Sequence, residues 1–235
     1  MNRVLVKSRI LLPSNEIDKT RWSCIACDQY ASQPEYWRKV ESLVGKSPST
    51  LRLMLPEAYL SESKTYIPKI HAAMNQYIRS DLLAPAVDGF VLVERETSCG
   101  TRVGVVGAVD LEAFDYFSRS ASAIRATEGT IAECLSPLIR SGAPIELPHA
   151  MLLFNDPGKT IVESLYARRQ ALRPLYDFDL MMDAGHIRGW AVEDADADAF
   201  LRAADSLSIG FSNPQYLVGD GNHSLAAAKR HWESI

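Results

Sequence analysis

The sequence lacks any long hydrophobic run. No stretch approaches the roughly 18 apolar residues that cross a bilayer as a helix. The N-terminal segment 1–7 carries positive residues without the apolar core of a secretory signal. We therefore expect a cytoplasmic protein with no membrane partner.

The sequence also lacks a block rich in lysine and arginine. Its 25 basic and 29 acidic residues give a formal net charge of −4 and a pI near 5.8. A protein that binds nucleic acid through its phosphates normally shows a basic surface in its composition. We therefore expect no nucleic-acid partner, and no pattern in the sequence indicates an oligomeric state.

Metal-binding patterns are scarce. Only Cys24 and Cys27 have the spacing of a ligand pair, and the remaining two cysteines do not form the second pair that a structural zinc site needs. The acidic run 193–198 lacks the glycine and the terminal glutamate of a calcium loop. We expect small buried thiols, and acids that occupy the first turn of a helix.

The hydrophobic residues, 47% of 235, suffice for a full core. Helical and alternating apolar periods occur in turn along the chain, which predicts an α/β protein. More closely, we expect an α+β mixed sheet with flanking helices and a single principal domain over residues 1–235. The predicted strands are 4–12, 87–94, 102–110, 148–154, 175–179 and 186–192, and the predicted helices are 34–44, 63–83, 131–141, 159–172 and the segment from the acidic run to Leu207.

Two of these strands are predicted to form a hairpin around 98–100. The charged residues near its tip are expected to pair across the two strands on a solvated face; they are Glu94, Arg95, Glu96 and Arg102. The apolar segment 148–154 is predicted as a buried strand, with His149 as a core histidine whose hydrogen bonds are satisfied.

The segment 215–229 combines strand, loop and helix patterns. Four residues with strand character lead into a loop that holds two glycines, an acid, an amide and an imidazole, and an alanine-rich helix follows. At such a junction, N–H groups without intrahelical partners meet the positive end of the helix dipole, which favours a phosphate. Asp220 could hold a cation or accept a proton, and His223 could donate to phosphate or act as acid or base.

The alternative for this loop is a purely structural turn. Its glycines would then supply positive φ angles, and Asn222 or Ser224 would cap the helix. The loop is neither a Walker A loop nor a G-x-G-x-x-G sequence, so the local pattern leaves both interpretations open.

Two further polar segments are candidates for function. Residues 118–130 are dense in hydroxyls and include Arg125, and such donors suit an anionic substrate, although an ordinary surface loop has the same composition. Residues 22–30 are apolar but include an acid, Asp28, and end near an amide, so this segment is a second candidate loop.

Three runs in the sequence resemble one bacterial family. They are W-S-C-I-A-C-D-Q-Y-A-S-Q-P-E-Y at 22–36, I-R-A-T-E-G-T at 124–130 and V-G-D-G-N-H-S-L-A-A-A-K at 218–229. These runs are spread over nearly the whole chain. On their resemblance, the protein is identified as a member of the uncharacterised conserved family called domain of unknown function 1015.

Many members of that family carry D-G-H-H-R where this chain has residues 220–224. The fuller motif is similar to the phosphate-binding loop of the ParB and sulfiredoxin superfamily, which includes nucleotide-dependent kinases of free serine. This resemblance implies a ParB/sulfiredoxin-like element around the C-terminal strand, loop and helix. It makes Asp220 the catalytic or metal-binding acid, gives Gly221 and Asn222 the role of presenting N–H groups to phosphate, and places His223 in contact with phosphate.

The chain departs from the family pattern at several positions. Ser224 supplies one O–H where the motif has the charged fork of arginine. In the segment that often reads R-x-H-E-K-T, the histidine and the lysine are Thr127 and Gly129, and Arg125 with Glu128 is the nearest replacement for the missing cation. Family members run longer, so this chain is expected to lack their C-terminal part.

The resemblance and the loop together predict a nucleotide-dependent phosphotransferase, that is, a kinase that acts on a small hydroxylated metabolite such as free serine. ATP or ADP with Mg²⁺ would be the cofactor, and the metabolite and the nucleotide the partners. The alternative is a non-catalytic nucleotide- or metabolite-binding regulator. The predicted catalytic residues are Asp220, His223, Asp28 and Glu128, the predicted cofactor-binding residues are Gly219, Gly221, Asn222, Ser224, Arg125 and Thr130, and the predicted metal ligand is Asp220.

Overall fold

The computed structural model describes residues 3–25, 30, 33–116, 121–129, 139–207 and 214–235. The helices are α1 Lys19–Trp22, α2 Pro34–Val44, α3 Ser63–Arg79, α4 Val162–Ala167, α5 Asp194–Asp205 and α6 Asn222–Glu233, with short 3₁₀ helices at Thr50–Arg52, Glu57–Glu62, Leu111–Ala113 and Arg169–Ala171. The strands are β1 Leu5–Val6, β2 Ser8–Pro13, β3 Leu83–Thr97, β4 Gly100–Val106, β5 Ala108–Val109, β6 Phe114–Asp115, β7 Ile124–Arg125, β8 Met151–Phe154, β9 Pro174–Asp179, β10 His186–Glu193 and β11 Tyr216–Asp220.

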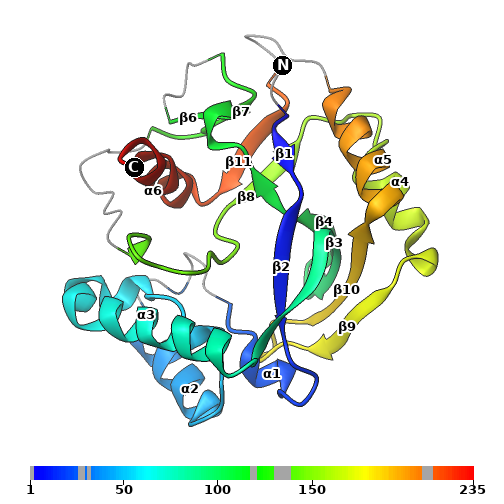
Figure 1. Ribbon diagram of the computed structural model, residues 1–235. Coiled ribbons are helices and arrows are strands. Elements are labelled where there is room, and N and C mark those ends of the chain that lie inside the picture. The colour runs from blue at the N-terminus through cyan, green and yellow to red at the C-terminus, as the bar shows by residue number, and fades with distance from the viewer. Residues whose placement is uncertain (1–2, 26–29, 31–32, 117–120, 130–138, 208–213) are drawn as a thin grey trace.

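The mixed α/β class is confirmed, but the described strands form separate sheets instead of one. A five-stranded antiparallel sheet has the order β2-β3-β10-β9, with β4 paired to β3 as the predicted hairpin. A four-stranded mixed sheet has the order β6-β7-β11-β8, in which β7 runs parallel to both β6 and β11. Strands β1 and β5 pair with each other, and α6 lies beside the four-stranded sheet (Figure 1).

Local sequence explains where several helices begin and end. Pro34 occupies the first turn of α2, where a missing N–H costs nothing, and Gly45 ends that helix with a φ of +55°. Asp194 and Asp196 lie in the first turn of α5, as the sequence predicts for this acidic run, and favour the helix dipole there. Among the described residues, no helix is long and apolar enough to cross a membrane.

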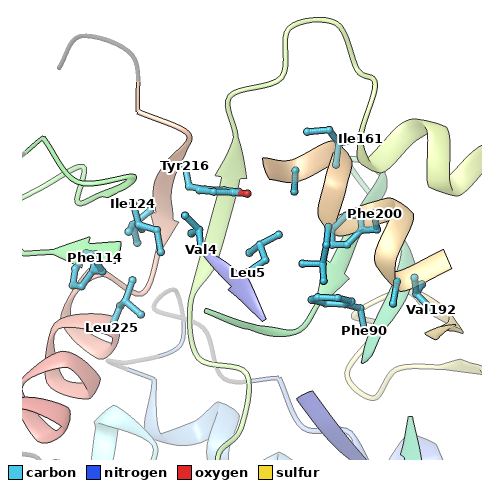
Figure 2. Close-up of a cluster of buried hydrophobic side chains, with 14 of the residues drawn as sticks. Val4, Leu5, Phe90, Phe114, Ile124, Ile161, Val192, Phe200, Tyr216 and Leu225 are labelled. Carbon is cyan, nitrogen blue, oxygen red and sulfur yellow. The ribbon is translucent and has the colours of Figure 1, made fainter. Parts of the chain in front are cut away.

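The largest core cluster joins the two main sheets. Figure 2 shows Val4 and Leu5, the second of them in β1, between side chains of the four-stranded sheet and those of the five-stranded sheet with α5. Tyr216 of β11 and Phe90 of β3 are each 1% exposed within this cluster. Burial of such side chains contributes about 1.5–3 kcal/mol each, so the core fixes the strand that leads into the candidate loop.

The prediction that the charged residues of the hairpin pair across its two strands is wrong. Arg95 lies opposite Arg102 on β4, so this cross-strand pair joins like charges. Glu94 is 6% exposed, and it accepts hydrogen bonds from Arg188 of β10 and from the Tyr166 hydroxyl. The Tyr166 hydrogen bond, followed by Arg188, lowers the pKa of Glu94. The strand paired with the other edge of β3 therefore supplies the partner.

Residues 151–154 do form a strand, but the prediction that the strand at 148–154 is buried is wrong. Strand β8 lies at the edge of the four-stranded sheet and covers only Met151–Phe154. Leu152 and Phe154 pack against the large core cluster, whereas Met151 and Leu153 are 45% and 50% exposed. An uninterrupted apolar run indicated burial on both faces, but one face of this edge strand is open.

Candidate functional site

The carboxyl ends of two parallel strands bring the candidate residues together. Strand β7 pairs in parallel with β11, so the segment after Arg125 and the loop after Asp220 leave the sheet at the same edge. Open α/β sheets place ligands at such an edge. The family-like segment 124–129 and the loop 219–224 are therefore neighbours in space although about 95 residues separate them.

Asn222 and Thr127 hold these two segments against each other. The Asn222 side chain is 5% exposed; its Oδ1 accepts from the Thr127 N–H at 3.1 Å, and its Nδ2 donates to the Thr127 hydroxyl at 3.1 Å. The Thr127 hydroxyl donates in turn to the Val218 carbonyl at 2.7 Å. Thr127, which the sequence marks only as a departure from the family pattern, is thus a structural part of the site.

A β-bulge turns Asp220 outward. Val218 lies opposite Leu152 and Asp220 lies opposite Met151, so Gly219 is the extra residue on β11. Without the bulge, Asp220 would lie on the same buried face as Val218, because residues i and i+2 of a strand share a face. The extra residue places the carboxylate on the exposed face instead, as bulges do beside many functional sites.

Gly221 is required by both its backbone conformation and its surroundings. Its φ of +81° lies in the left-handed region that favours glycine. A Cβ at this position would overlap the His149 carbonyl oxygen and lie 2.9 Å from the Ala150 Cα. The close approach of the loop to the segment before β8 therefore depends on this glycine.

The start of α6 presents backbone donors. Leu225 N–H donates to the Gly221 carbonyl at 2.9 Å, which is the first bond of the helix. The N–H groups of Asn222, His223 and Ser224 precede it, and no side chain caps the helix. The alternative in which Asn222 or Ser224 caps α6 is therefore wrong. The N–H groups at the start of α6 can donate to an anion, which the positive end of the helix dipole also favours.

Of the other predicted site residues, the structure places Glu128 and Arg125 near the loop, and it does not describe Asp28 and Thr130. Asn222 Nδ2 lies 3.4 Å from Glu128 Oε1, which brings that carboxylate to the loop. Arg125 lies opposite Leu217 on β7, at the strand end that leads to Thr127. Asp28 and Thr130 lie outside the described residues.

Asp220 and His223 carry the reactive side chains of the loop. Both side chains are exposed, and within the described residues neither side chain forms a hydrogen bond or an ion pair. Both groups are therefore available to a ligand. The Asn222 amide, by contrast, is fully engaged, so only its backbone N–H remains for the phosphate contact that the resemblance implies.

A cluster of Arg140, Glu146 and His149 behind the loop was missed by sequence reasoning. His149, expected to be satisfied, has a buried Nδ1 without a hydrogen-bond partner; its Nε2 lies 3.5 Å from Glu146 Oε1, and Arg140 lies 3.0 Å from the same oxygen. Burial, and then the nearby Arg140 charge, lower the pKa of His149 to about 4. The imidazole is neutral at neutral pH, so Arg140 is the ionic partner of Glu146. No motif in the sequence indicates this cluster.

The loop suits Mg²⁺ only together with a phosphate ligand. Within the described ranges, no group of three or more His, Cys, Asp or Glu side chains is placed to hold a metal ion. Mg²⁺ is commonly bound by one or two carboxylates with substrate phosphates and water. The single outward carboxylate of Asp220 beside the α6 donors fits that arrangement.

Comparisons with known proteins identify a family but no characterised relative. No curated protein and no solved structure matches the chain. The model of the family described as "Protein of unknown function (DUF1015)" matches residues 11–235. The match covers nearly the entire chain, and the chain therefore belongs to this family.

Proposed function

We propose that the chain is a nucleotide-dependent phosphotransferase that acts on a small hydroxylated metabolite and binds ATP or ADP with Mg²⁺ at the loop between β11 and α6. One observation carries the proposal: the N–H groups that open α6 and the outward carboxylate of Asp220 lie on consecutive residues of one loop. Anion donors beside an available carboxylate are what binding of a metal–phosphate group requires.

Each residue of the loop has a role in this proposal. The N–H groups of residues 222–224 and the His223 side chain hold phosphate oxygens. Asp220 either holds Mg²⁺ or accepts the proton of the attacking hydroxyl, and Glu128, which Asn222 brings to the loop, is a second base. Arg125 neutralises charge that develops on the transferred group.

The reaction class follows from what these groups can do. Phosphoryl transfer needs positioning and charge neutralisation more than a covalent intermediate. A strand end and a helix start supply rigid positioning, and the loop needs no nucleophile of its own. Free serine as the acceptor comes only from the resemblance to the ParB and sulfiredoxin superfamily.

Turnover of a small panel of hydroxylated acceptors, including serine, tests the proposal. Phosphorus NMR would follow ATP or ADP consumption with Mg²⁺ in the wild type and in Asp220→Asn. Asp81→Asn makes the same chemical change at an exposed residue with φ of +53°, a conformation that asparagine tolerates. We expect turnover in the wild type and in Asp81→Asn but not in Asp220→Asn; full turnover in Asp220→Asn would exclude Asp220 from both roles.

A non-catalytic regulator that binds a nucleotide or a metabolite is the second candidate. The engaged Asn222 amide and the serine at position 224 favour it, because they leave the loop with fewer charged donors than the family motif has. A regulator would be stabilised by its ligand without forming product. A ligand at 100 times its Kd adds about 2.7 kcal/mol to the free energy of unfolding.

A further inference from the structure

A pocket lies on the opposite face of the five-stranded sheet from the large core. It has a volume of about 610 Å³ and lies among α1, the end of β2, the start of β3 and β9. None of its lining residues belongs to the β11–α6 loop. Its size falls in the range of pockets that bind small molecules, about 300–1,000 Å³.

Apolar and aromatic side chains form much of the wall of this pocket, and several of them are held in place. Trp22 is 7% exposed and packs against Tyr77, and the Thr20 hydroxyl donates to the Asp179 carbonyl at 2.7 Å, which ties α1 to β9. Tyr176 and Phe178 of β9 meet edge to face at 5.8 Å. The pocket is therefore formed without any ligand, which lowers the entropic cost of binding.

Gly189 makes room for one of these walls. A Cβ at Gly189 on β10 would overlap the ring of Tyr176, so the ring lies flat across the glycine. Burial raises the pKa of Tyr176 to about 12, and its hydroxyl therefore remains a protonated donor. No described residue forms a hydrogen bond with that hydroxyl.

The charges of the pocket have one sign. Its lining includes Lys19 and Arg173 but no acidic residue, although the chain has more acids than bases. Arg173 is already paired with Glu193 at 2.7 Å. The Lys19 ammonium has no ion-pair partner among the described residues, and Asp18, its neighbour in sequence, contacts Arg21 at 3.5 Å instead.

From this combination we propose that the pocket binds a small carboxylate with an apolar body, such as a medium-chain aliphatic acid. The apolar walls would cover the hydrocarbon body, and Lys19 would hold the carboxylate with the Tyr176 hydroxyl as a second donor. An ammonium–carboxylate hydrogen bond is stronger than a neutral one and selects the anion over an uncharged analogue. This site is independent of the proposed phosphotransferase activity.

Octanoate and 1-octanol provide a matched pair of test ligands, because their chains are alike and only octanoate carries a charge. Binding to the full chain would be followed by calorimetry and by tryptophan fluorescence, with Trp22→Phe identifying the reporting side chain. Lys19→Gln removes the charge at similar length. Lys39→Gln makes the same change on the exposed face of α2.

We expect octanoate to bind at one saturable site and more tightly than octanol. Lys19→Gln should weaken octanoate roughly tenfold or more while leaving octanol unchanged. Lys39→Gln should bind octanoate as the wild type does, and Tyr176→Phe should weaken it less than Lys19→Gln. The proposal is overturned if octanoate shows no saturable binding at millimolar concentration, binds no better than octanol, or binds equally well to Lys19→Gln.

Discussion

The Asn222 side chain forms two hydrogen bonds of 3.1 Å with Thr127, one accepted from its backbone N–H and one donated to its hydroxyl, and so joins the start of α6 to the segment after β7. These two residues lie 95 positions apart. The relationship fixes the geometry of the loop that precedes α6, because Asn222 follows Asp220 and Gly221 directly. It is also the contact that brings Glu128 to within 3.4 Å of the loop.

Removing this link should cost stability. Asn222→Ala deletes a buried amide and leaves the Thr127 N–H without its acceptor, so we expect a loss of about 1–3 kcal/mol in the free energy of unfolding, measured by urea denaturation. Asn75→Ala is the control, because its amide donates to the His71 carbonyl within the same helix, α3, and alanine favours that helix. Equal, small effects of both substitutions would show that the link does not hold the two segments together.

Gly221→Ala should destabilise the protein more than an ordinary glycine substitution at positive φ. Gly100, with φ of +119°, offers a matched control, since a Cβ there would meet nothing within 4 Å, whereas at Gly221 it would overlap the His149 carbonyl. Strain alone should cost about 1–2 kcal/mol at either position, and the overlap should add about 1–3 kcal/mol at Gly221 only. Indistinguishable unfolding midpoints for the two variants would contradict the close approach at this loop.

The local elements could be predicted from sequence better than their partners. The strand, loop and helix at 215–229 were recognisable because period and glycine placement are local signals. The Asn222–Thr127 link and the bulge at Gly219 were not, because both depend on which strand lies alongside β11 and in which register. A register change of one residue moves every side chain to the other face, and the amino-acid pattern of β11 does not reveal it.

Burial was the other property that sequence patterns did not settle. The apolar run at 148–154 indicated a buried strand, but sheet order makes β8 an edge and exposes Met151 and Leu153. The charges of the hairpin indicated a solvated face, but Glu94 is covered and paired with Arg188 of β10. In both cases the neighbouring strand decides the outcome, and that strand is distant in sequence.

His149 should make the protein sensitive to acid. The pKa of this histidine falls from 6.5 to about 4 on folding, chiefly because of burial, so the unfolded chain binds the proton first as the pH falls. Its contribution to stability is therefore complete above about pH 6.5 and is lost towards pH 4, by an amount on the order of 3 kcal/mol. In His149→Gln, urea denaturation at a series of pH values should show a smaller loss of stability over this range.

His186 provides a control of opposite sign. Hydrogen bonds to Asp179 and then Asp177 raise its pKa, so its contribution is present below pH 6.5 and is lost as the pH rises through the folded-state value. His186→Gln should therefore lose stability mainly on the acidic side. An acid response of His149→Gln identical to that of the wild type would contradict a buried neutral imidazole at position 149.

An arginine in the first turn of α6 should strengthen phosphate binding. Ser224→Arg supplies the charged fork that the resemblance implies for this position, and one charge-assisted hydrogen bond to phosphate corresponds to roughly tenfold in Kd. Ser234→Arg adds the same charge at the opposite end of the helix, where it should leave phosphate affinity unchanged. Titration with inorganic phosphate would compare the two, and equal affinities would argue against an anion site at the start of α6.

The most direct measurement is calorimetric titration of the chain with ATP and with ADP, each with Mg²⁺, in the wild type, Asp220→Asn and His223→Ala. The account predicts saturable binding of at least one nucleotide to the wild type, and clearly weaker binding to both variants, because the loop supplies the carboxylate and the imidazole. No saturable binding at millimolar nucleotide, or unchanged affinity in both variants, would contradict a nucleotide site between β11 and α6.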